Sequence, residues 1–181
     1  GFRQGTSMAT PNVVGTLALI QELNHKLEGT YLNSSALKGL AIHTAREAGT
    51  SDGPDYSFGW GLMNGKAAAD LLLERNGKNK IVRNFVLNDG ENISLDINPI
   101  QNTDVKITIC WTDVPGTPVA VQLDPSDLML VNDLDMRVSD GGTTYMPWIL
   151  NPEIPSGPAT KGDNFRDNIE KVEFVANTNE K

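Results

Sequence analysis

Residues 1–15 read GFRQGTSMATPNVVG, and the rest of the chain is interpreted outward from this stretch. The apolar run after Pro11 predicts a helix, and the N-terminus of a helix favours a developing negative charge. The hydroxyl of Ser7 at this end would become a nucleophile if a base took its proton. Pro11 fits a first helical turn, where its missing N–H has no partner, and Gly5 leaves room for a substrate backbone. An ordinary capped helix start is the simpler alternative.

The segment Gly5-Thr6-Ser7-Met8-Ala9-Thr10-Pro11 resembles the nucleophile segment of subtilisin-like serine proteases, the subtilases. The resemblance implies that Ser7 is the nucleophile of a secreted endopeptidase that cleaves polypeptides through an acyl-enzyme. It also implies a catalytic Asp and then a His earlier in the chain than the serine. Both would precede residue 1. We therefore expect the sequence to be a fragment of a longer precursor that is inactive by itself.

The composition narrows the class of protein. With 181 residues, of which 39% are hydrophobic, the chain can bury a core. The net charge of −8 argues against a nucleic-acid or anionic-membrane partner and suits a cation-binding protein. A single cysteine cannot form an intrachain disulfide, and no apolar run has transmembrane length. The resemblance to subtilases implies a secreted or cell-surface protein that leaves the cell by bacterial-type export.

Three helices are predicted in the first half of the chain. The first covers residues 13–27, is apolar on most of its faces and ends at Gly29. The second covers residues 36–47 with Asn33 before it, and the third covers residues 66–75 with Asn64 as its cap. The segment around Gly59 and Gly61, with the helix after it, resembles the closing segment of the subtilisin-like catalytic domain.

After residue 80 the apolar period changes to two, as in strands that are buried on one face. The alternating runs lie at 93–97, 105–111, 128–138 and 172–176, and turn-forming residues separate them. This pattern predicts an antiparallel β-sandwich. Residues 130–135, 144–145 and 166–170 resemble the β-jelly-roll domain, related to the proprotein-convertase P domain, that follows the catalytic domain in some bacterial subtilases.

The fold class we predict is therefore α + β in two parts. Residues 1–78 would form the helical C-terminal part of a subtilisin-like α/β domain, with a linker at 76–79. Residues 79–181 would form a jelly-roll β-sandwich that is truncated at its C-terminus. The alternative function is that of a non-catalytic β-sandwich module that binds a ligand or stabilises its neighbour.

Acidic residues suggest a metal site in the second part. Asp133 and Asp135 would share one face of a strand, where like charges repel unless a cation compensates them. A loop supplies further oxygen atoms from Asp163, Asn164 and Asp167. The resemblance to subtilases, which often bind calcium, favours a structural calcium ion. Neutralisation by Arg137 and plain surface charge are the alternatives left open.

The two histidines, His25 and His43, both follow Ser7 in the chain. This order differs from that of subtilases, so we expect neither to be the catalytic base, and His43 to be a packed, hydrogen-bonded helix residue. The first helix is apolar on most faces, and the sandwich would lack its last strand. We therefore expect the fragment to self-associate.

Overall fold

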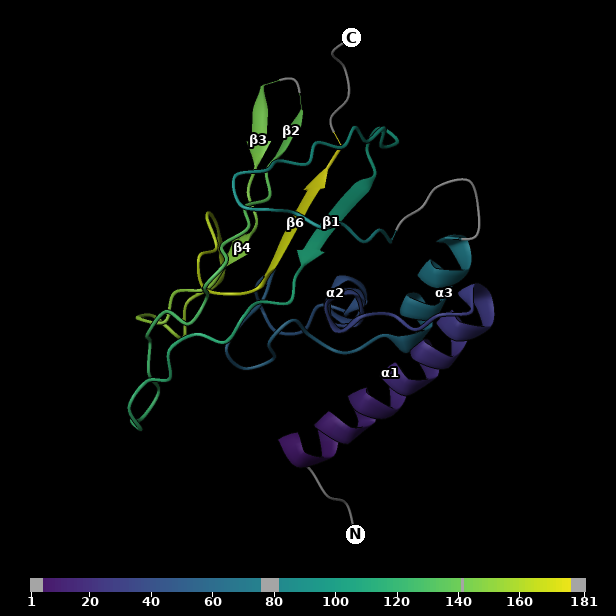
Figure 1. Cartoon of the computed structure of the whole chain (residues 1–181). Coiled ribbons are helices and arrows are strands. Elements are labelled where there is room, and N and C mark those ends of the chain that lie inside the picture. The colour runs from purple at the N-terminus through teal and green to yellow at the C-terminus, as the bar shows by residue number, and fades with distance from the viewer. Residues whose placement is uncertain (1–4, 76–81, 141, 177–181) are drawn as a thin grey trace.

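The computed structural model describes residues 5–75, 82–140 and 142–176. It is a mixed α and β structure in which the helices come first in the chain and the strands follow (Figure 1). The elements are α1 (Thr6–Glu28), α2 (Ser34–Thr44), α3 (Gly65–Arg75), β1 (Asp104–Cys110), β2 (Val138–Asp140), β3 (Thr143–Tyr145), β4 (Trp148–Ile149), β5 (Thr160–Lys161) and β6 (Ile169–Val175).

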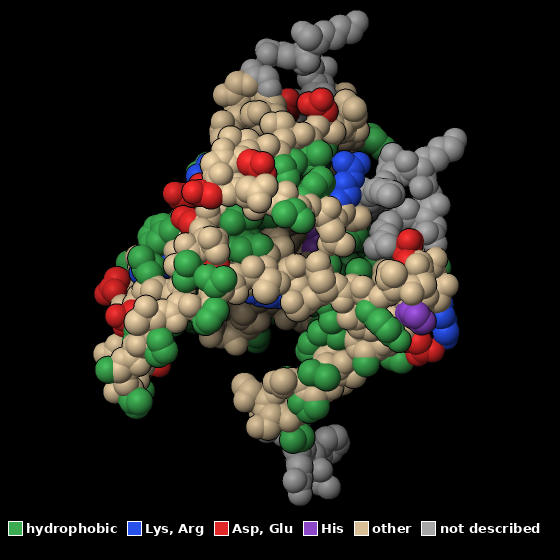
Figure 2. Space-filling model, viewed as in Figure 1, with side chains coloured by type: hydrophobic (Ala, Val, Ile, Leu, Met, Phe, Trp, Pro, Cys, Tyr) green, Lys and Arg blue, Asp and Glu red, His purple; other side chains and the backbone are tan. Residues whose placement is uncertain are grey.

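Helix α1 has 23 residues, which makes it about 34 Å long. It begins seven residues before the predicted start and ends at Gly29, whose φ of 71° is the left-handed conformation that glycine adopts at no steric cost. Its C-terminal half packs on α3, whereas Val14 and Leu19 are 59% and 66% exposed. Figure 2 shows hydrophobic side chains along the exposed length of this helix.

The caps predicted for the two shorter helices are confirmed. The side-chain oxygen of Asn33 accepts a hydrogen bond from the Ala36 N–H at 2.8 Å, and that of Asn64 accepts one from the Ala67 N–H at 3.0 Å. Each bond satisfies an N–H group that the helix itself leaves free. The three helices bury one apolar core, which consists of Ile20, Leu32, Leu40, Ala68 and Leu72.

The described strands form three separate antiparallel pairs, β1 with β6, β2 with β3, and β4 with β5. In the longest pair, Val105 faces Phe174 and Ile107 faces Val172. The runs at 105–111 and 172–176 are thus confirmed as strands, apart from Trp111 and Ala176, which lie just beyond β1 and β6. The sandwich or jelly roll stays a prediction, because no closed barrel and no sheet of more than two strands forms among the described residues.

The predicted strand at 93–97 is wrong, and the predicted strand at 128–138 is wrong except at its last residue, Val138, which begins β2. Residues 93–97 and 128–137 are irregular and join no described strand pair, although their apolar and polar side chains alternate. Ile93, Leu95 and Ile97 remain 44–52% exposed. Alternation marks a face that can be buried, but a strand also needs a neighbour for its N–H and C=O groups. The described structure supplies none for these two runs.

The helical part and the β part meet where α2 packs on β1. His43 Nδ1 and Thr108 Oγ1 are hydrogen-bonded at 3.0 Å, and the Ser34 and Thr112 hydroxyls lie 3.3 Å apart. Lys38 donates to the side-chain oxygen of Asn168 in the segment before β6. The predicted boundary at residues 78 and 79 and the predicted linker at 76–79 lie outside the described residues.

Candidate functional site

Ser7 is the second residue of α1 and is exposed. Gly5 precedes the helix with a φ of 136°, a conformation that side chains rarely adopt, so the backbone itself explains this glycine. The Gly5 carbonyl accepts from the Met8 and Ala9 N–H groups at 2.9 and 3.1 Å. Helix geometry leaves the N–H groups of Thr6 and Ser7 without an intrahelical acceptor, so this end presents donors beside the hydroxyl.

Pro11 lies inside α1 rather than in its first turn. The helix begins at Thr6, so Pro11 is its sixth residue. The prediction that Pro11 lies in the first turn, where its missing N–H would have no partner, is wrong. In an α-helix that N–H would bond to the carbonyl four residues earlier, which belongs to Ser7. Pro11 therefore leaves the Ser7 carbonyl without its helical donor, and the backbone at the serine loses one restraint.

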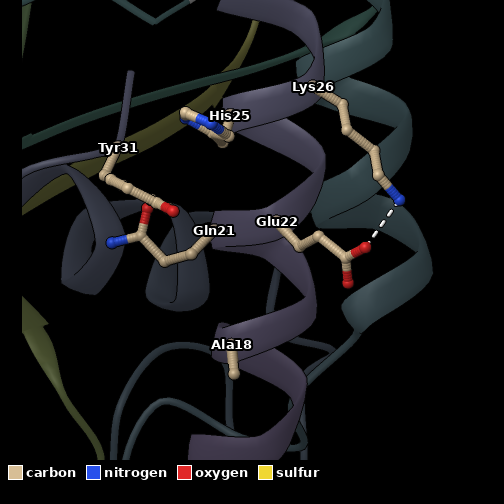
Figure 3. A pocket seen from close by; sticks show the side chains of 6 residues that line it. All are labelled: Ala18, Gln21, Glu22, His25, Lys26 and Tyr31. Carbon is tan, nitrogen blue, oxygen red and sulfur yellow. Dashed lines mark hydrogen bonds and ion pairs between the residues drawn. The ribbon is translucent and has the colours of Figure 1, made fainter. Parts of the chain in front are cut away.

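Neither histidine lies within reach of Ser7. His25 is on the same helix 18 residues further on, which is about 27 Å along the axis. Its ring stacks on that of Tyr31 with the centroids 4.6 Å apart, beside a surface hollow of about 680 Å³ (Figure 3). Glu22, which also lines this hollow, is paired with Lys26 at 2.6 Å. The hollow therefore offers Ser7 no base.

His43 is the packed, hydrogen-bonded residue that the sequence predicts. It is partly buried between α2 and β1 and shares a hydrogen bond with Thr108. Burial lowers the pKa of its imidazole, and the positive charges of Lys171 and Lys106 lower it further, against an opposing effect of Glu173. A neutral His43 can bond to a hydroxyl at the interface but cannot act on a serine at the far end of α1.

Three carboxylates of the β part come together from separate segments. One oxygen each of Asp135, Asp163 and Glu170 lies within 4.8 Å of the others. Arg137 bridges the first two, with its Nη2 at 2.9 Å from Asp135 Oδ1 and 2.9 Å from Asp163 Oδ1. The structure thus brings together two of the predicted metal residues, Asp135 and Asp163, and gives both the arginine partner that the sequence left open as an alternative.

Asp133, Asn164 and Asp167 lie outside this three-carboxylate group. Asp133 is a neighbour of the group. Partial burial raises the pKa of its carboxyl, and the negative charges of Asp135 and Asp163 raise it further. Asn164 is buried: its amide nitrogen donates to the Ile169 carbonyl, and its oxygen accepts from two backbone N–H groups of its own loop. Asp167 is exposed.

Glu170 is a member of this group that the sequence analysis missed. Its residue exposure is 0%, its Oε2 accepts the Met136 N–H, and its Oε1 is buried without a hydrogen-bond partner. An unsatisfied buried oxygen costs about 1–3 kcal/mol. Burial raises the pKa of this carboxyl to about 7 despite the Met136 hydrogen bond and the charge of Arg137. The sequence did contain a signal for its burial, because Glu170 lies on the same face of β6 as Val172 and Phe174.

A second charged network surrounds Glu173 near the middle of β6. Its Oε1 is 2.9 Å from Lys106 Nζ and 3.2 Å from Lys171 Nζ, and its Oε2 accepts from Trp148 Nε1 at 2.7 Å. Burial raises the pKa of the Glu173 carboxyl, but the hydrogen bonds and the lysine charges outweigh it and bring the pKa to about 2. The ring of Trp148 has a cationic neighbour as well, since Lys161 Nζ lies over it at 3.3 Å from the ring centroid.

Two aromatic side chains, those of Tyr145 and Trp148, make packing contacts of the β part. Tyr145 stacks on Phe174 with the ring centroids 4.0 Å apart, which joins β3 to β6. Trp148 lies against Gly53, where a Cβ atom would come within 2.7 Å of the indole ring. The loop between α2 and α3 therefore contacts the β part at a second point.

Comparison with known proteins identifies a class for the N-terminal part. The model of the subtilase family matches residues 2–61, about a third of the chain. The matched range includes α1, α2 and Ser7, and it ends before β1. No curated protein and no solved structure matches the chain. Residues 2–61 are therefore similar to subtilases, a family of serine peptidases.

Within the described ranges, no helix combines the length and the apolar character that crossing a bilayer requires. The longest, α1, has 23 residues, but it alternates apolar side chains with Gln21, Glu22, Asn24 and Lys26.

Proposed function

We propose that this chain supplies the nucleophile, Ser7, of a secreted subtilisin-like serine endopeptidase that hydrolyses polypeptides. The match of residues 2–61 to the subtilase family carries the proposal, because the matched range includes the serine. The position of Ser7 in the first turn of a long helix supports it, since free N–H groups there favour an oxyanion.

In the reaction, Ser7 Oγ attacks the carbonyl carbon of a peptide bond while a histidine takes its proton. The Ser7 N–H is one donor to the oxyanion. The histidine then protonates the leaving amine, and water hydrolyses the acyl-enzyme. Because His25 and His43 both lie away from Ser7, the base has to come from outside these 181 residues. The isolated chain should therefore show no hydrolase activity.

The test compares two serines at equivalent helix positions in the protein as its host produces it. Ser7 is the second residue of α1, and Ser35 is the second residue of α2. Ser7→Ala should abolish hydrolysis of a protein substrate and labelling by a fluorophosphonate probe, whereas Ser35→Ala should leave both unchanged. Retained activity in purified Ser7→Ala protein, or a label on another serine, would exclude Ser7 as the nucleophile.

A second function, stabilisation of the helical part by the β part, is favoured by the contacts between α2 and β1. The hydrogen bond of Thr108 to His43 crosses this interface, as does that of Asn168 to Lys38. Thr108→Val keeps the shape of the side chain and removes its hydroxyl. It should lower the melting temperature of the whole chain by about 2–4 °C if the interface contributes about 1 kcal/mol. An unchanged melting temperature would contradict a stabilising role.

A further inference from the structure

The loop between β1 and β2 contains an arm that stands clear of the rest of the chain. Residues 117–125, here called the arm, are all exposed, and Figure 1 shows this part of the loop projecting from the β part at lower left. Val121 is fully exposed and Leu123 is 91% exposed. Within the described parts of the chain, the arm makes no backbone–backbone hydrogen bond. The fold therefore leaves this largely apolar stretch without a packing partner.

The base of the same loop, in contrast, is closed. The Asp113 carboxylate accepts hydrogen bonds from the Val131 N–H at 2.7 Å and from the Asn132 N–H at 3.1 Å. Gly116 lies so close to Met129 that a Cβ atom there would collide with the Met129 carbonyl oxygen. A break within the arm would therefore leave the two ends of the loop side by side.

Further contacts join the parts of the chain that precede and follow the arm. Strand β1 precedes it and strand β6 follows it, and the two strands pair over their whole lengths. The Lys106 ammonium on β1 is 2.9 Å from the Glu173 carboxylate on β6. Lys38 on α2 donates a hydrogen bond to Asn168 in the segment before β6. These contacts hold the two parts together without a covalent connection through the arm.

An endopeptidase can cut such a segment without unfolding its target. A protein that binds an extended peptide forms hydrogen bonds to the peptide backbone and has pockets for alternate side chains. A folded segment must open before it can enter a cleft, and the free energy of opening lowers the rate of cleavage. The arm avoids this cost because its backbone is unpaired. Its apolar residues Val119, Val121 and Leu123 also lie at alternate positions.

Another long exposed run, residues 83–98, is less open than the arm. Ile93, Leu95 and Ile97 are 44–52% exposed, so about half of each side chain is covered. Pulling this run away from the body of the protein would bring the covered apolar surface into water, which is unfavourable. The arm is therefore the better point of cleavage of the two.

We propose that the arm is a processing site, at which an endopeptidase cuts the chain into two pieces that remain bound to each other. The reaction is a hydrolysis in which one peptide C–N bond breaks. The hydroxyl of water goes to the carbonyl carbon and the proton goes to the nitrogen. The first piece carries the helices and β1, and the second carries β2 to β6. The site is independent of Ser7, because an added protease can perform the step.

The first experiment treats the whole natural chain with a trace of a broad-specificity serine endopeptidase and follows the products over time. Mass spectrometry of the denatured products should find a cut within residues 117–125 before any cut within residues 83–98. Light scattering under native conditions, at the same protein concentration, should find the same mass before and after the cut. An earlier cut within residues 83–98, or separation of the pieces on either side of the arm, would overturn the proposal.

Leu123→Arg and Leu95→Arg provide a matched pair for a second experiment. Each places a trypsin site at a leucine that an aspartate follows, the first in the arm and the second in residues 83–98. Trypsin should cut at the new site in Leu123→Arg at least about 10-fold faster than at the new site in Leu95→Arg, because only the latter has to pull covered chain free. Equal or reversed rates, in chains whose circular dichroism matches that of the natural chain, would overturn the proposal. If Leu95→Arg fails to fold, the first experiment decides.

Discussion

The substitution Glu173→Gln tests whether the charged network on β6 stabilises the fold. The change keeps the shape of the side chain and removes its charge, so that Lys106 and Lys171 lose their shared partner. The loss matters most at Lys171, whose side chain is only 6% exposed, because a buried ammonium without a counter-charge is costly. Lys106 is 46% exposed, and water can replace its partner.

The pKa of Glu173 sets the expected magnitude. It falls from 4.5 to about 2 on folding. At about 1.36 kcal/mol per pKa unit, the ionised carboxylate stabilises the native state by about 3 kcal/mol. Since the pKa is depressed, this contribution is complete above the unfolded value of 4.5 and disappears as the pH falls through about 2. Linkage gives about 1.4 kcal/mol at pH 3, roughly half of the value at pH 7.

Urea unfolding at pH 7 and pH 3, followed by circular dichroism, measures this difference. Glu173→Gln should lower the free energy of unfolding by about 3 kcal/mol at pH 7 and by about half as much at pH 3. Glu153→Gln makes the same chemical change at an exposed position and should stay within about 0.5 kcal/mol of the natural chain at both values. The reasoning would be refuted by a loss below 0.5 kcal/mol, or by a loss that is equal at the two pH values.

Burial lowers the pKa of Lys161 to about 8, so about half of its side chains are neutral at pH 8, against about 0.3% for an ordinary lysine. An amine-reactive ester at pH 8 should therefore label Lys161 faster than it labels Lys66, although the side chain of Lys66 is 84% exposed; peptide mapping that finds equal rates would contradict this. The exposed Val14 and Leu19 of α1 should make the chain self-associate. Its mass by light scattering should rise with concentration, and Leu19→Glu should reduce the rise, whereas a constant monomer mass would exclude it.

The sequence predicted those features that depend on neighbouring residues. The caps Asn33 and Asn64 and the left-handed Gly29 each act within a few residues of their helix end, so their spacing carries the whole signal. The predicted strand at 93–97 is wrong, and so is the one at 128–138 up to residue 137, because pairing requires a distant partner that alternation alone cannot show. The position of Pro11 within the helix was predicted wrongly, because the start of α1 depends on the conformation of Gly5.

The same distinction between local and long-range features applies to the candidate sites. Ser7 was predicted from a contiguous motif, and the family match covers that motif. Glu170 could not be assigned to this group from its charge alone, because its carboxylate meets Met136 and Asp163 only in the folded chain. The pairing of Asp135 with Asp163 through Arg137 likewise joins residues 28 positions apart, which only tertiary structure can do.

Helix α2, which lies within the range that the subtilase family model matches, links the helical part to the β part. Its approach to β1 is close, because a Cβ atom at Gly39 would lie 3.2 Å from that of Cys110. The polar bonds on either side of this contact, at Ser34 and His43, contribute only about 0.5–1.5 kcal/mol each. Their main effect is to fix the position of β1 along α2. A shift of β1 along α2 would break both bonds at once, so even this small interface allows only one register. Together with the contact of Gly53 with Trp148, α2 thus sets the position of the β part relative to α1, because it packs on α3 and shares one core with α1.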